Sequence, residues 1–509
     1  MAICKLDRKN GSLNGRLLLT VAIALATLPC QARADWPQLQ HDARHTGYSP
    51  ETIEAPNGFK SGWRRSFAEL KPFERISRVV QVIAADNKIF VPTLFGNLYA
   101  LNPADGKTIW RFQSGEPVMH TAAVAGGRVF FATIEGSVFA VDSETGQRIW
   151  RWNNNKRTGF SAAVCLADGK VFIGGRDGDF HALDQNTGQL LWSYQLDHPI
   201  YQTAAYHENS VYFAAEDMHC YALNAGDGTL KWKSEKLFGG SFRDFYPLIH
   251  KGLIILESMP IWHNHGGQNN FGGVKFPLTA WWTLRNERQI NWINKYGPLI
   301  EKGQIPPEAM KDLIAAQDYQ TDYFKKRPEQ NLRFTLDLNT GKQPYIMPLA
   351  IQSMCGNQPP PAVGRNGMLI MPLRFGRCGW GTLDPETGYL NDIFFEMGEI
   401  NDKQYQTAHG GCSGDENIFH TSAGPWVFVV HANEHGPGPG KIHGHPASYT
   451  GAYNRDRRKW YPLPSLFDYS RFVNLSRATN SQCGGSAASI AYDALYHQTV
   501  DTIHCWIPE

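Results

Sequence analysis

One unit is written four times between Ile89 and Trp232, and this repeat limits what the chain can fold into. Each copy closes on a tryptophan, and the spacings between these residues are 40, 42 and 40: Trp110, Trp150, Trp192 and Trp232. A turn glycine keeps the same intervals: Gly106, Gly146, Gly188 and Gly228. A fixed period near 40 residues is typical of repeat architectures, in which each copy forms one supersecondary unit.

Each copy contains short runs in which apolar and polar residues alternate, for example Val129–Thr133 and Ser137–Asp142. Alternation at a period of two predicts half-buried strands, and the glycine-bearing segment between the runs predicts a turn. A third strand ends at the tryptophan, and a fourth, rich in small residues, precedes each copy, as at Thr121–Ala125. Four antiparallel strands in about 40 residues predict one blade of a β-propeller.

The repeat resembles the PQQ-like (pyrroloquinoline-quinone-type) repeat of a β-propeller family. In that family the pattern Leu-Asp-x-x-Thr-Gly-x-x-x-Trp docks each blade onto its neighbour, and Leu183 to Trp192 matches it throughout. The resemblance implies a docking role for five tryptophans: Trp63, Trp110, Trp150, Trp192 and Trp232. The same propeller serves quinone-dependent dehydrogenases and cofactor-free scaffold proteins of bacterial outer-membrane assembly, so the repeat alone leaves the function open.

Counting the repeats predicts an all-β propeller of eight four-stranded blades, with seven blades as the alternative. Trp63 belongs to a lone strand near the N-terminus, and three strands after Ser486 lack a fourth. We therefore expect the N- and C-terminal strands to share the last blade, which removes free sheet edges. Asp35–Pro50 should lie across the propeller as an irregular segment.

Two insertions interrupt the repeats, at residues 260–330 in blade five and at residues 431–446 in blade seven. Within the first, Pro307–Phe324 has proline in its first turn and apolar residues at near-helical spacing, which predicts a helix. A loop this long inside a compact fold is usually functional. We expect the blade-five insertion to cap the channel or to bind a partner.

The N-terminus has the pattern of an export signal. Basic residues precede the apolar run Leu17–Leu28, and Ala32-Arg33-Ala34 is a cleavage site. The pattern predicts a signal peptide over residues 1–34 and a periplasmic or secreted mature chain over residues 35–509, without a transmembrane segment. A membrane anchor is the alternative, although the run is short for a bilayer. Removing five basic residues and one aspartate changes the formal charge from +2 to −2, so charge gives no reason to expect nucleic-acid binding.

Residues just before the innermost strands of a propeller face the channel mouth, and here they are unusually polar. Seven of them form a candidate ligand-binding ring: Arg78, His120, Gln202, Arg243, Asp244, Asn357 and His409. Arginine pairs bidentately with carboxylates, and the family's quinone cofactor carries carboxylates. Simple solvation of a wet channel mouth is the alternative, because ligand pockets are few in any protein.

The leading functional prediction is an exported scaffold that binds a protein or a small ligand. The alternative is a periplasmic oxidoreductase that uses PQQ and calcium to oxidise an alcohol or a sugar, with Asp244 as the candidate catalytic residue. The adjacent cysteine pair of the alcohol-oxidising relatives is missing. A calcium set drawn from Asp244, Glu257, Asn269 and Asn270 has no diagnostic spacing.

A cluster of histidines gives a third functional hypothesis, a metal-binding redox propeller. Four histidines of the second insertion are candidate zinc or copper ligands: His431, His435, His443 and His445. Solvent-exposed loop histidines are the alternative, because this spacing matches no known motif.

Export permits disulfides, and two pairs are candidates. Cys355 would pair with Cys378 in blade six, and Cys483 with Cys505 in blade eight. Cys165 and Cys220 fall in predicted strands and are expected to be buried thiols: small apolar side chains of this kind are often fully buried.

Overall fold

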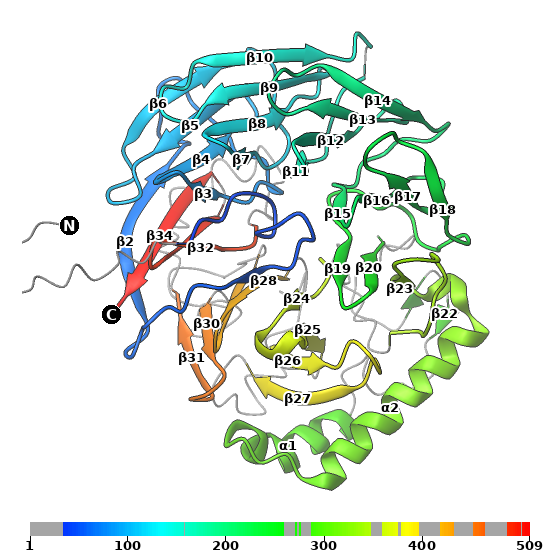
Figure 1. Ribbon diagram of the computed structural model, residues 1–509. Coiled ribbons are helices and arrows are strands. Elements are labelled where there is room, and N and C mark those ends of the chain that lie inside the picture. Colours follow the sequence, from blue (N-terminus) through cyan, green and yellow to red (C-terminus); the bar gives the residue numbers. More distant parts are fainter. Residues whose placement is uncertain are drawn as a thin grey trace, which may run out of the picture. The chain divides into compact units, whose positions relative to one another are not determined.

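The structure is a computed structural model of the chain (Figure 1). It describes residues 34–156, 158–258, 270–271, 274–275, 287–347, 359–374, 378–395, 418–431, 451–463, 486–499 and 501–509. The predicted signal peptide therefore lies outside the described residues, apart from Ala34.

Eight small sheets stand around one axis and form an eight-bladed propeller, as the repeat count predicts (Figure 1). Blades one to four are the four sequence repeats, and in each the strands run antiparallel from the innermost to the outermost. Blade one comprises β3 (Ile83–Ala85), β4 (Lys88–Pro92), β5 (Asn97–Leu101) and β6 (Thr108–Gln113). Blade two comprises β7 (Ala123–Ala125), β8 (Arg128–Ala132), β9 (Ser137–Asp142) and β10 (Arg148–Asn153).

Blades three and four repeat this plan. Blade three comprises β11 (Cys165–Ala167), β12 (Lys170–Gly174), β13 (Asp179–Asp184) and β14 (Leu190–Gln195). Blade four comprises β15 (Ala205–His207), β16 (Ser210–Ala214), β17 (Cys220–Asn224) and β18 (Leu230–Lys233). The two middle strands of each blade are mostly buried, because neighbouring blades cover both of their faces, whereas the outermost strands are largely exposed.

Blade five holds the long insertion between its second and third strands. The blade comprises β19 (Leu248–His250), β20 (Leu253–Glu257) and β23 (Arg333–Asp337). The insertion contains the hairpin β21 (Asn270–Phe271) and β22 (Val274–Lys275), the helices α1 (Glu287–Glu301) and α2 (Pro307–Lys326), and a short 3₁₀ turn (Pro328–Gln330). The helix predicted at Pro307–Phe324 is confirmed as α2.

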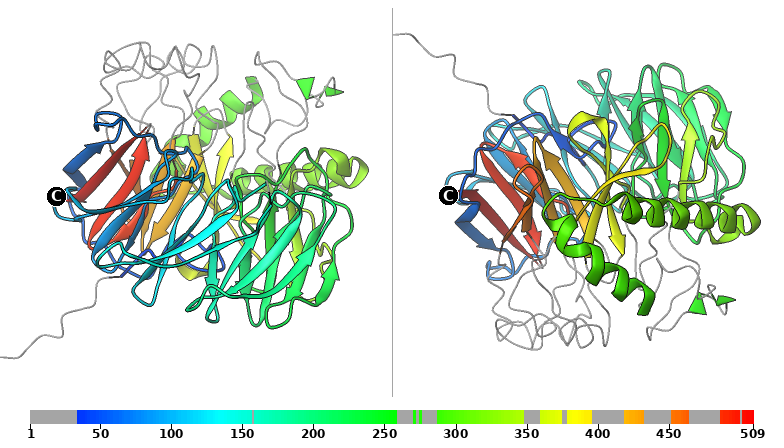
Figure 2. Two further views of the ribbon diagram at one scale, coloured as in Figure 1. Left: turned by 90° about the horizontal axis from the view of Figure 1, so that it is seen from above. Right: turned by 90° about the horizontal axis from the view of Figure 1, so that it is seen from below.

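The helix α1 was not predicted, because Gly297-Pro298 inside it has the pattern of a break. Packing compensates: Trp292, Tyr296 and Ile300 of α1 join one apolar cluster with the strands of blade six. Figure 2 shows both helices along the outside of the blades. Neither α1 nor α2, the long helices of the described residues, has the length and apolar composition needed to cross a membrane.

Blade six follows the insertion, and its third and fourth strands carry the last clear copy of the turn pattern. It comprises β24 (Ala362–Val363), β25 (Leu369–Arg374), β26 (Cys378–Leu383) and β27 (Leu390–Phe395), with a 3₁₀ turn (Arg365–Gly367) after β24. Blade seven comprises β28 (Ile418–Ala423), β29 (Trp426–His431), β30 (Gly451–Asn454) and β31 (Lys459–Pro462). A short N-terminal strand, β1 (Tyr48–Ser49), pairs parallel with β28 on its channel side.

The last blade joins the two ends of the chain. It comprises β32 (Ser489–Ala491), β33 (Ala494–Thr499), β34 (Thr502–Pro508) and the N-terminal strand β2 (Phe59–Ser66), which pairs antiparallel with β34. The predicted closure by terminal strands is therefore confirmed, and the alternative of seven blades is excluded.

Tryptophans dock each blade onto the next. Trp110 on β6 donates its indole N–H to the carbonyl oxygen of Ser143 at 3.0 Å, and its ring covers Gly146. A Cβ atom on Gly146 would lie 2.6 Å from that ring, so the position has room only for glycine. Four further predicted docking residues make the same carbonyl contact: Trp63 with Pro103, Trp150 with Gln185, Trp192 with Ala225 and Trp232 with Leu338.

Tyr345 takes the place of the tryptophan between blades five and six. Its hydroxyl donates to the carbonyl oxygen of Pro385 at 2.6 Å, and its ring covers Gly388. A tyrosine fits here because it offers the same combination of a large ring and one hydrogen-bond donor. The docking contact therefore continues past the repeats in which the sequence displays it clearly.

The N-terminal segment, residues 35–49, runs around the channel and binds the innermost strands one after another. Its main-chain oxygens accept hydrogen bonds of 2.7–3.2 Å from six blades: Trp36 from Ala84, Pro37 from Val124, Ala43 from Tyr206, Arg44 from Ile249, Thr46 from Val363 and Gly47 from Ser422. Blade three is bound by the side chain of Gln38, which accepts from the main-chain N–H of Leu166 at 3.1 Å. The predicted irregular segment is thus a belt along the inner edges of seven blades.

Candidate functional site at the channel mouth

Five of the seven predicted mouth residues lie in the described part of the chain. The loops before four innermost strands carry them: Arg78 in blade one, His120 in blade two, Gln202 in blade four, and Arg243 and Asp244 in blade five. Since the innermost strands all run in the same direction, these loops lie at one end of the channel. Asn357 and His409 lie outside the described residues.

An ion pair joins opposite sides of this mouth. Nη2 of Arg78 lies 3.0 Å from Oδ2 of Asp244, which links blade one to blade five. Asp244 has a φ of +68°, a conformation that aspartate tolerates better than most residues. The Arg78 side chain is 53% exposed and that of Asp244 is 17% exposed, so solvent screens the pair from one side.

His120 is buried below the mouth as a neutral ring. Its Nδ1 accepts a hydrogen bond of 2.8 Å from the main-chain N–H of Thr121, which places the ring proton on Nε2. Burial lowers the pKa of His120 to about 3. Its Nε2 is buried and has no hydrogen-bond partner. His120 therefore presents an unused N–H donor.

Gln202 offers a second unused donor, and Arg243 a cation on an aromatic face. Oε1 of Gln202 accepts from the main-chain N–H of Ala214 at 2.7 Å, whereas its amide nitrogen is buried without a partner. The guanidinium of Arg243 lies 4.3 Å from the centre of the Tyr201 ring. Donors of this kind suit a carbonyl or carboxylate oxygen, or a water molecule.

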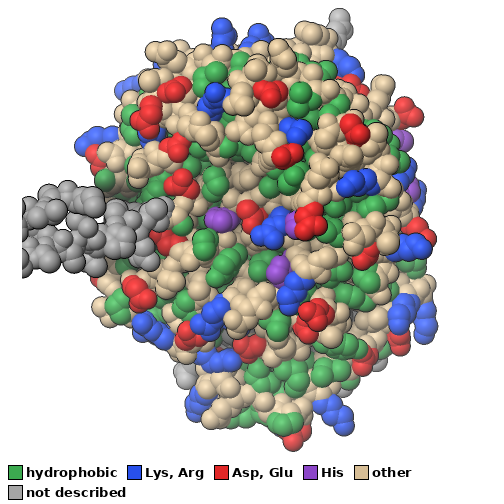
Figure 3. All heavy atoms as spheres, in the orientation of Figure 1, with side chains coloured by type: hydrophobic (Ala, Val, Ile, Leu, Met, Phe, Trp, Pro, Cys, Tyr) green, Lys and Arg blue, Asp and Glu red, His purple; other side chains and the backbone are tan. Residues whose placement is uncertain are grey.

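The belt of residues 35–49 meets the innermost strands themselves, so it lies farther along the channel than the mouth residues. His45 fixes it there: Nδ1 lies 2.9 Å from the carbonyl oxygen of Leu39, and Nε2 lies 2.9 Å from that of Ala204. Burial lowers the pKa of His45, and the two carbonyls oppose that shift. Figure 3 shows acidic, basic and histidine side chains gathered near the middle of the face that Figure 1 presents, where the belt crosses.

The described residues do not assemble a calcium site for a quinone. Asp244 is paired with Arg78, and Glu257 forms a buried ion pair with Arg333 inside blade five. Burial raises the pKa of Glu257 to about 7, against the opposite effect of the Arg333 charge. The remaining two candidates, Asn269 and the side chain of Asn270, are not among the described atoms, so PQQ binding stays a prediction.

The histidine and disulfide predictions fall mostly outside the described residues. His431 ends β29, and His435, His443 and His445 lie beyond the described range, as do Cys355 and Cys483. Cys378 begins β26, and Cys505 on β34 is a buried free thiol whose pKa burial raises to about 12. Cys165 and Cys220 are buried free thiols, as predicted.

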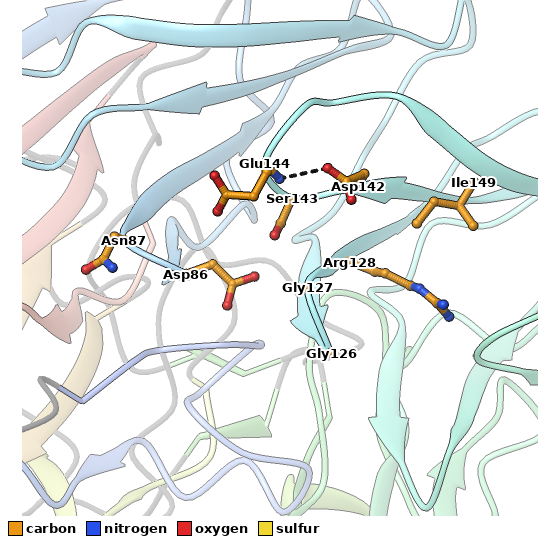
Figure 4. Close-up of a pocket in the computed structure, with 9 residues that line it drawn as sticks. All are labelled: Asp86, Asn87, Gly126, Gly127, Arg128, Asp142, Ser143, Glu144 and Ile149. Carbon is orange, nitrogen blue, oxygen red and sulfur yellow. Dashed lines mark hydrogen bonds between the residues drawn. The ribbon is translucent and has the colours of Figure 1, made fainter.

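One pocket was not predicted. It has a volume of about 600 Å³. The turns after the innermost strands of blades one and two line it, together with the turn between β9 and β10 of blade two. Figure 4 shows Asp86, Ser143 and Glu144 turned toward this space, and Arg128 extending away from it. Glu144 pairs with Lys88 at 2.5 Å. The turn residues in the sequence predict hairpins. They do not predict the pocket, because the pocket forms only where blades one and two meet.

The family comparison agrees with this architecture. The family described as outer membrane protein assembly factor BamB has a model that matches residues 53–160 and 134–242, which cover β2 and blades one to four. No curated protein matches the chain in sequence.

Solved structures resemble nearly the whole chain. BamB from Moraxella catarrhalis has a TM-score of 0.51 at 11% identity, and the match covers 88% of this chain and 99% of that one. A europium-containing methanol dehydrogenase has a TM-score of 0.54 at 11% identity, with 93% and 98% covered. The computationally designed Ika8 protein has a TM-score of 0.53 at 10% identity, with 88% and 99% covered.

These matches include an assembly factor, a dehydrogenase and a designed protein, so they carry the fold and not a function. The repeat, the eight closed blades and the tryptophan docking contacts agree with one another. Residues 53–242 match the model of this repeat family, and the chain has the fold of a PQQ-like β-propeller.

Proposed function

We propose that this chain is a periplasmic scaffold that holds a protein partner on the outer rim of blades one to four. The supporting observation is a set of exposed aliphatic side chains that recurs on the outermost strands of these four blades. Their exposed fractions lie between 42% and 48%: Ile109, Ile149, Leu190, Leu191 and Leu230. Each of these side chains lies one or two residues before the docking tryptophan of its blade, and their recurrence on four successive blades favours an interaction surface over chance exposure.

The outermost strands add a second kind of contact. β6, β10, β14 and β18 each end their sheet, so one edge of each strand has main-chain groups that the sheet does not use. Such edges pair with an extended segment of another protein in β-strand addition. An extended partner segment would meet both the aliphatic side chains and a free strand edge.

The family match supports the class of partner. The matched residues cover the same four blades that carry the rim, and the matching family is described as an outer membrane protein assembly factor. Together with the predicted export signal, this favours a partner among the proteins of outer-membrane assembly.

A pull-down from bacterial envelope extracts, followed by affinity measurement with each captured protein, tests the proposal. The double variant Leu190→Asp, Leu230→Asp should weaken binding at least about tenfold, because it places charges in an apolar contact. The matched control is Ile314→Asp on α2, an exposed isoleucine of the blade-five insertion. If only Ile314→Asp loses binding, the partner binds the blade-five insertion, and the proposal that it binds the outer rim is wrong.

A quinoprotein dehydrogenase is the second candidate function. Its support is the pair of buried, unused donors at the mouth, Nε2 of His120 and the amide nitrogen of Gln202. Calorimetric titration of the mature chain with PQQ, with and without calcium, separates the two functions. Micromolar PQQ binding that Arg243→Ala abolishes would favour the dehydrogenase. If the titration releases no heat of binding, the scaffold remains the favoured function.

A further inference from the structure

Three side chains at the start of β13 lie close enough to share one ion. One carboxylate oxygen each from Asp177 and Asp179 and one ring nitrogen of His181 all lie within 4.8 Å of one another. Asp179 and His181 are two residues apart on the strand, so their side chains share a face. All three groups are withdrawn from solvent: the side chains of Asp177 and Asp179 are 8% and 13% exposed, and His181 is 4% exposed.

Two atoms of this cluster are buried without a partner. Nδ1 of His181 lies 2.7 Å from Oγ of Ser193, which fixes the ring, whereas Nε2 has no hydrogen-bond partner. Oδ1 of Asp179 is likewise buried and unpartnered. Since buried polar atoms are nearly always satisfied, two such atoms on neighbouring ligand-type side chains indicate a missing partner.

The hydrogen bond and the neighbouring rings of His181 suit a metal ligand. A neutral ring is the form that binds metal, and an outer hydrogen bond such as that to Ser193 sets the tautomer and orientation of metal-ligating histidines. The rings of Trp152 and Phe160 lie beside it, at 4.9 and 6.1 Å between centroids, and shield it from water.

Lys156 occupies the place of a cation in the structure. Its Nζ lies 2.6 Å from Oδ2 of Asp179 and 3.4 Å from Oδ2 of Asp177, and its contact with Asp179 raises its pKa. Asn154 donates a further hydrogen bond of 3.3 Å to Asp177. The lysine comes from the loop after β10 and is 42% exposed, so it can turn into solvent and leave two carboxylates for a divalent ion.

The other sequence repeats do not combine these ligands. The residues equivalent to positions 177, 179 and 181 are Phe95, Asn97 and Tyr99 in blade one, Glu135, Ser137 and Phe139 in blade two, and Asp217, His219 and Tyr221 in blade four. In blade four, Asp217 accepts from the Tyr221 hydroxyl at 2.6 Å and from Lys233 at 2.9 Å, so its acid is satisfied within the blade. Among the four copies, only blade three carries two aspartates and a histidine.

We propose that Asp177, Asp179 and His181 bind a divalent transition-metal ion of the zinc class, which displaces the ammonium of Lys156. One imidazole and two carboxylates, with water at a fourth position, match the tetrahedral shell of zinc. Calcium and magnesium prefer oxygen ligands and make less use of the imidazole. A zinc ion about 2.1 Å from each ligand atom would bring those atoms to roughly 3.4 Å from one another. Small rotations of the two aspartate side chains achieve this.

The test is calorimetric titration of the metal-stripped mature chain with zinc chloride. His181→Phe should lower the zinc affinity at least about tenfold, because it removes the nitrogen ligand. Phenylalanine is compatible with the strand, since Phe139 stands at this position in blade two. Lys156→Met should raise the affinity about tenfold by removing the competing charge. The control His219→Phe removes a histidine of blade four, at the position equivalent to Asp179, and should leave the affinity unchanged.

Cobalt gives an independent readout, because a tetrahedral cobalt site absorbs strongly in the visible range and the band should vanish in His181→Phe. Zinc binding that survives His181→Phe would overturn the proposal and point to other histidines, such as those predicted in residues 431–446. Absence of binding in both the wild type and Lys156→Met would overturn it as well. If His181→Phe loses its β-sheet circular dichroism, Asp179→Asn takes its place in the comparison.

Discussion

Arg78 of blade one and Asp244 of blade five form an ion pair across the channel mouth, with 3.0 Å between Nη2 and Oδ2. The two residues are 166 positions apart in the chain, and only the closed ring brings their loops to the same opening. The pair occupies the charges that a carboxylate ligand or a calcium ion would use. A charged ligand at the mouth would therefore compete with this ion pair.

We expect the pair to be weak. A double-mutant cycle with Arg78→Gln and Asp244→Asn should give a coupling energy below about 1 kcal/mol, since solvent reaches Arg78. Asparagine also tolerates the positive φ at this position. Urea unfolding at low and high salt measures the coupling, which should shrink as salt increases. A coupling of several kcal/mol that salt does not change would show that the mouth is closed to solvent.

Closure of the ring gives a second prediction. Trp63 of blade eight donates its indole N–H to Pro103 of blade one at 2.6 Å and covers Gly106. Trp63→Ala should lower the free energy of unfolding by about 3 kcal/mol, because it removes a large ring from the interface that joins the ends of the chain. Urea unfolding measures the loss. Lys60→Ala, at an exposed position of the same strand, is the control and should change stability by less than about 0.5 kcal/mol.

The sequence predicted the propeller because every blade repeats the same local signals. Alternation fixes the strands, the turn glycines fix the reversals, and the docking tryptophans fix the contact between blades. The docking role of Tyr345 was not predicted, because tyrosine replaces tryptophan there and the surrounding sequence no longer follows the repeat. The helix α1 was not predicted, because it contains a glycine and a proline that normally end a helix. Its packing on blade six compensates for them.

The candidate site could be predicted only in part. The position of Arg78 and Asp244 before innermost strands could be predicted from the sequence, whereas their ion pair depends on two blades that face each other across the channel. The sequence did not predict the cluster at Asp177, Asp179 and His181, because one histidine beside two acids is a weaker signal for a metal site than a group of histidines. The available signal was the spacing of Asp177, Asp179 and His181 at every second position, which places two acids and a histidine on the same side of the chain.

The belt gives a third prediction through Gln38. The side-chain amide of Gln38 makes the two hydrogen bonds that the main chain of a neighbouring strand would make. Its Oε1 accepts from the main-chain N–H of Leu166 at 3.1 Å, and its Nε2 donates to the carbonyl oxygen of the same residue at 3.4 Å. Gln38→Ala would leave both buried groups unpaired, which should cost about 2 kcal/mol of folding stability. Urea unfolding should show this loss, whereas Glu54→Ala at an exposed position should not. Equal stability of the two variants would mean that water replaces the amide.

The attachment of α2 gives a fourth prediction. Gln317 is buried and holds the helix to blade six: its Oε1 accepts from the main-chain N–H of Leu390 at 3.2 Å, and its Nε2 lies 3.5 Å from the oxygen of Gly388. Gln317→Ala should loosen the helix without unfolding the blades. Limited proteolysis should then cut within Pro307–Lys326 faster than in the wild type, while the midpoint of thermal unfolding changes little. Lys311→Ala on the same helix is the control.

The stability of blade eight should depend on pH through His504. Burial lowers the pKa of this residue to about 4, from an ordinary value near 6.5. Between these two values the unfolded chain binds a proton that the folded chain excludes, so the stability due to the neutral ring is complete above pH 6.5 and is lost as the pH falls toward 4. At pH 5 the loss should be about 2 kcal/mol. We expect His504→Gln to remove this part of the pH dependence. The exposed variant His198→Gln should retain it, with urea unfolding at pH 7 and pH 5 as the measurement. A wild-type and a His504→Gln protein with the same pH dependence would show that the ring is already charged, or already accessible to water, in the folded state.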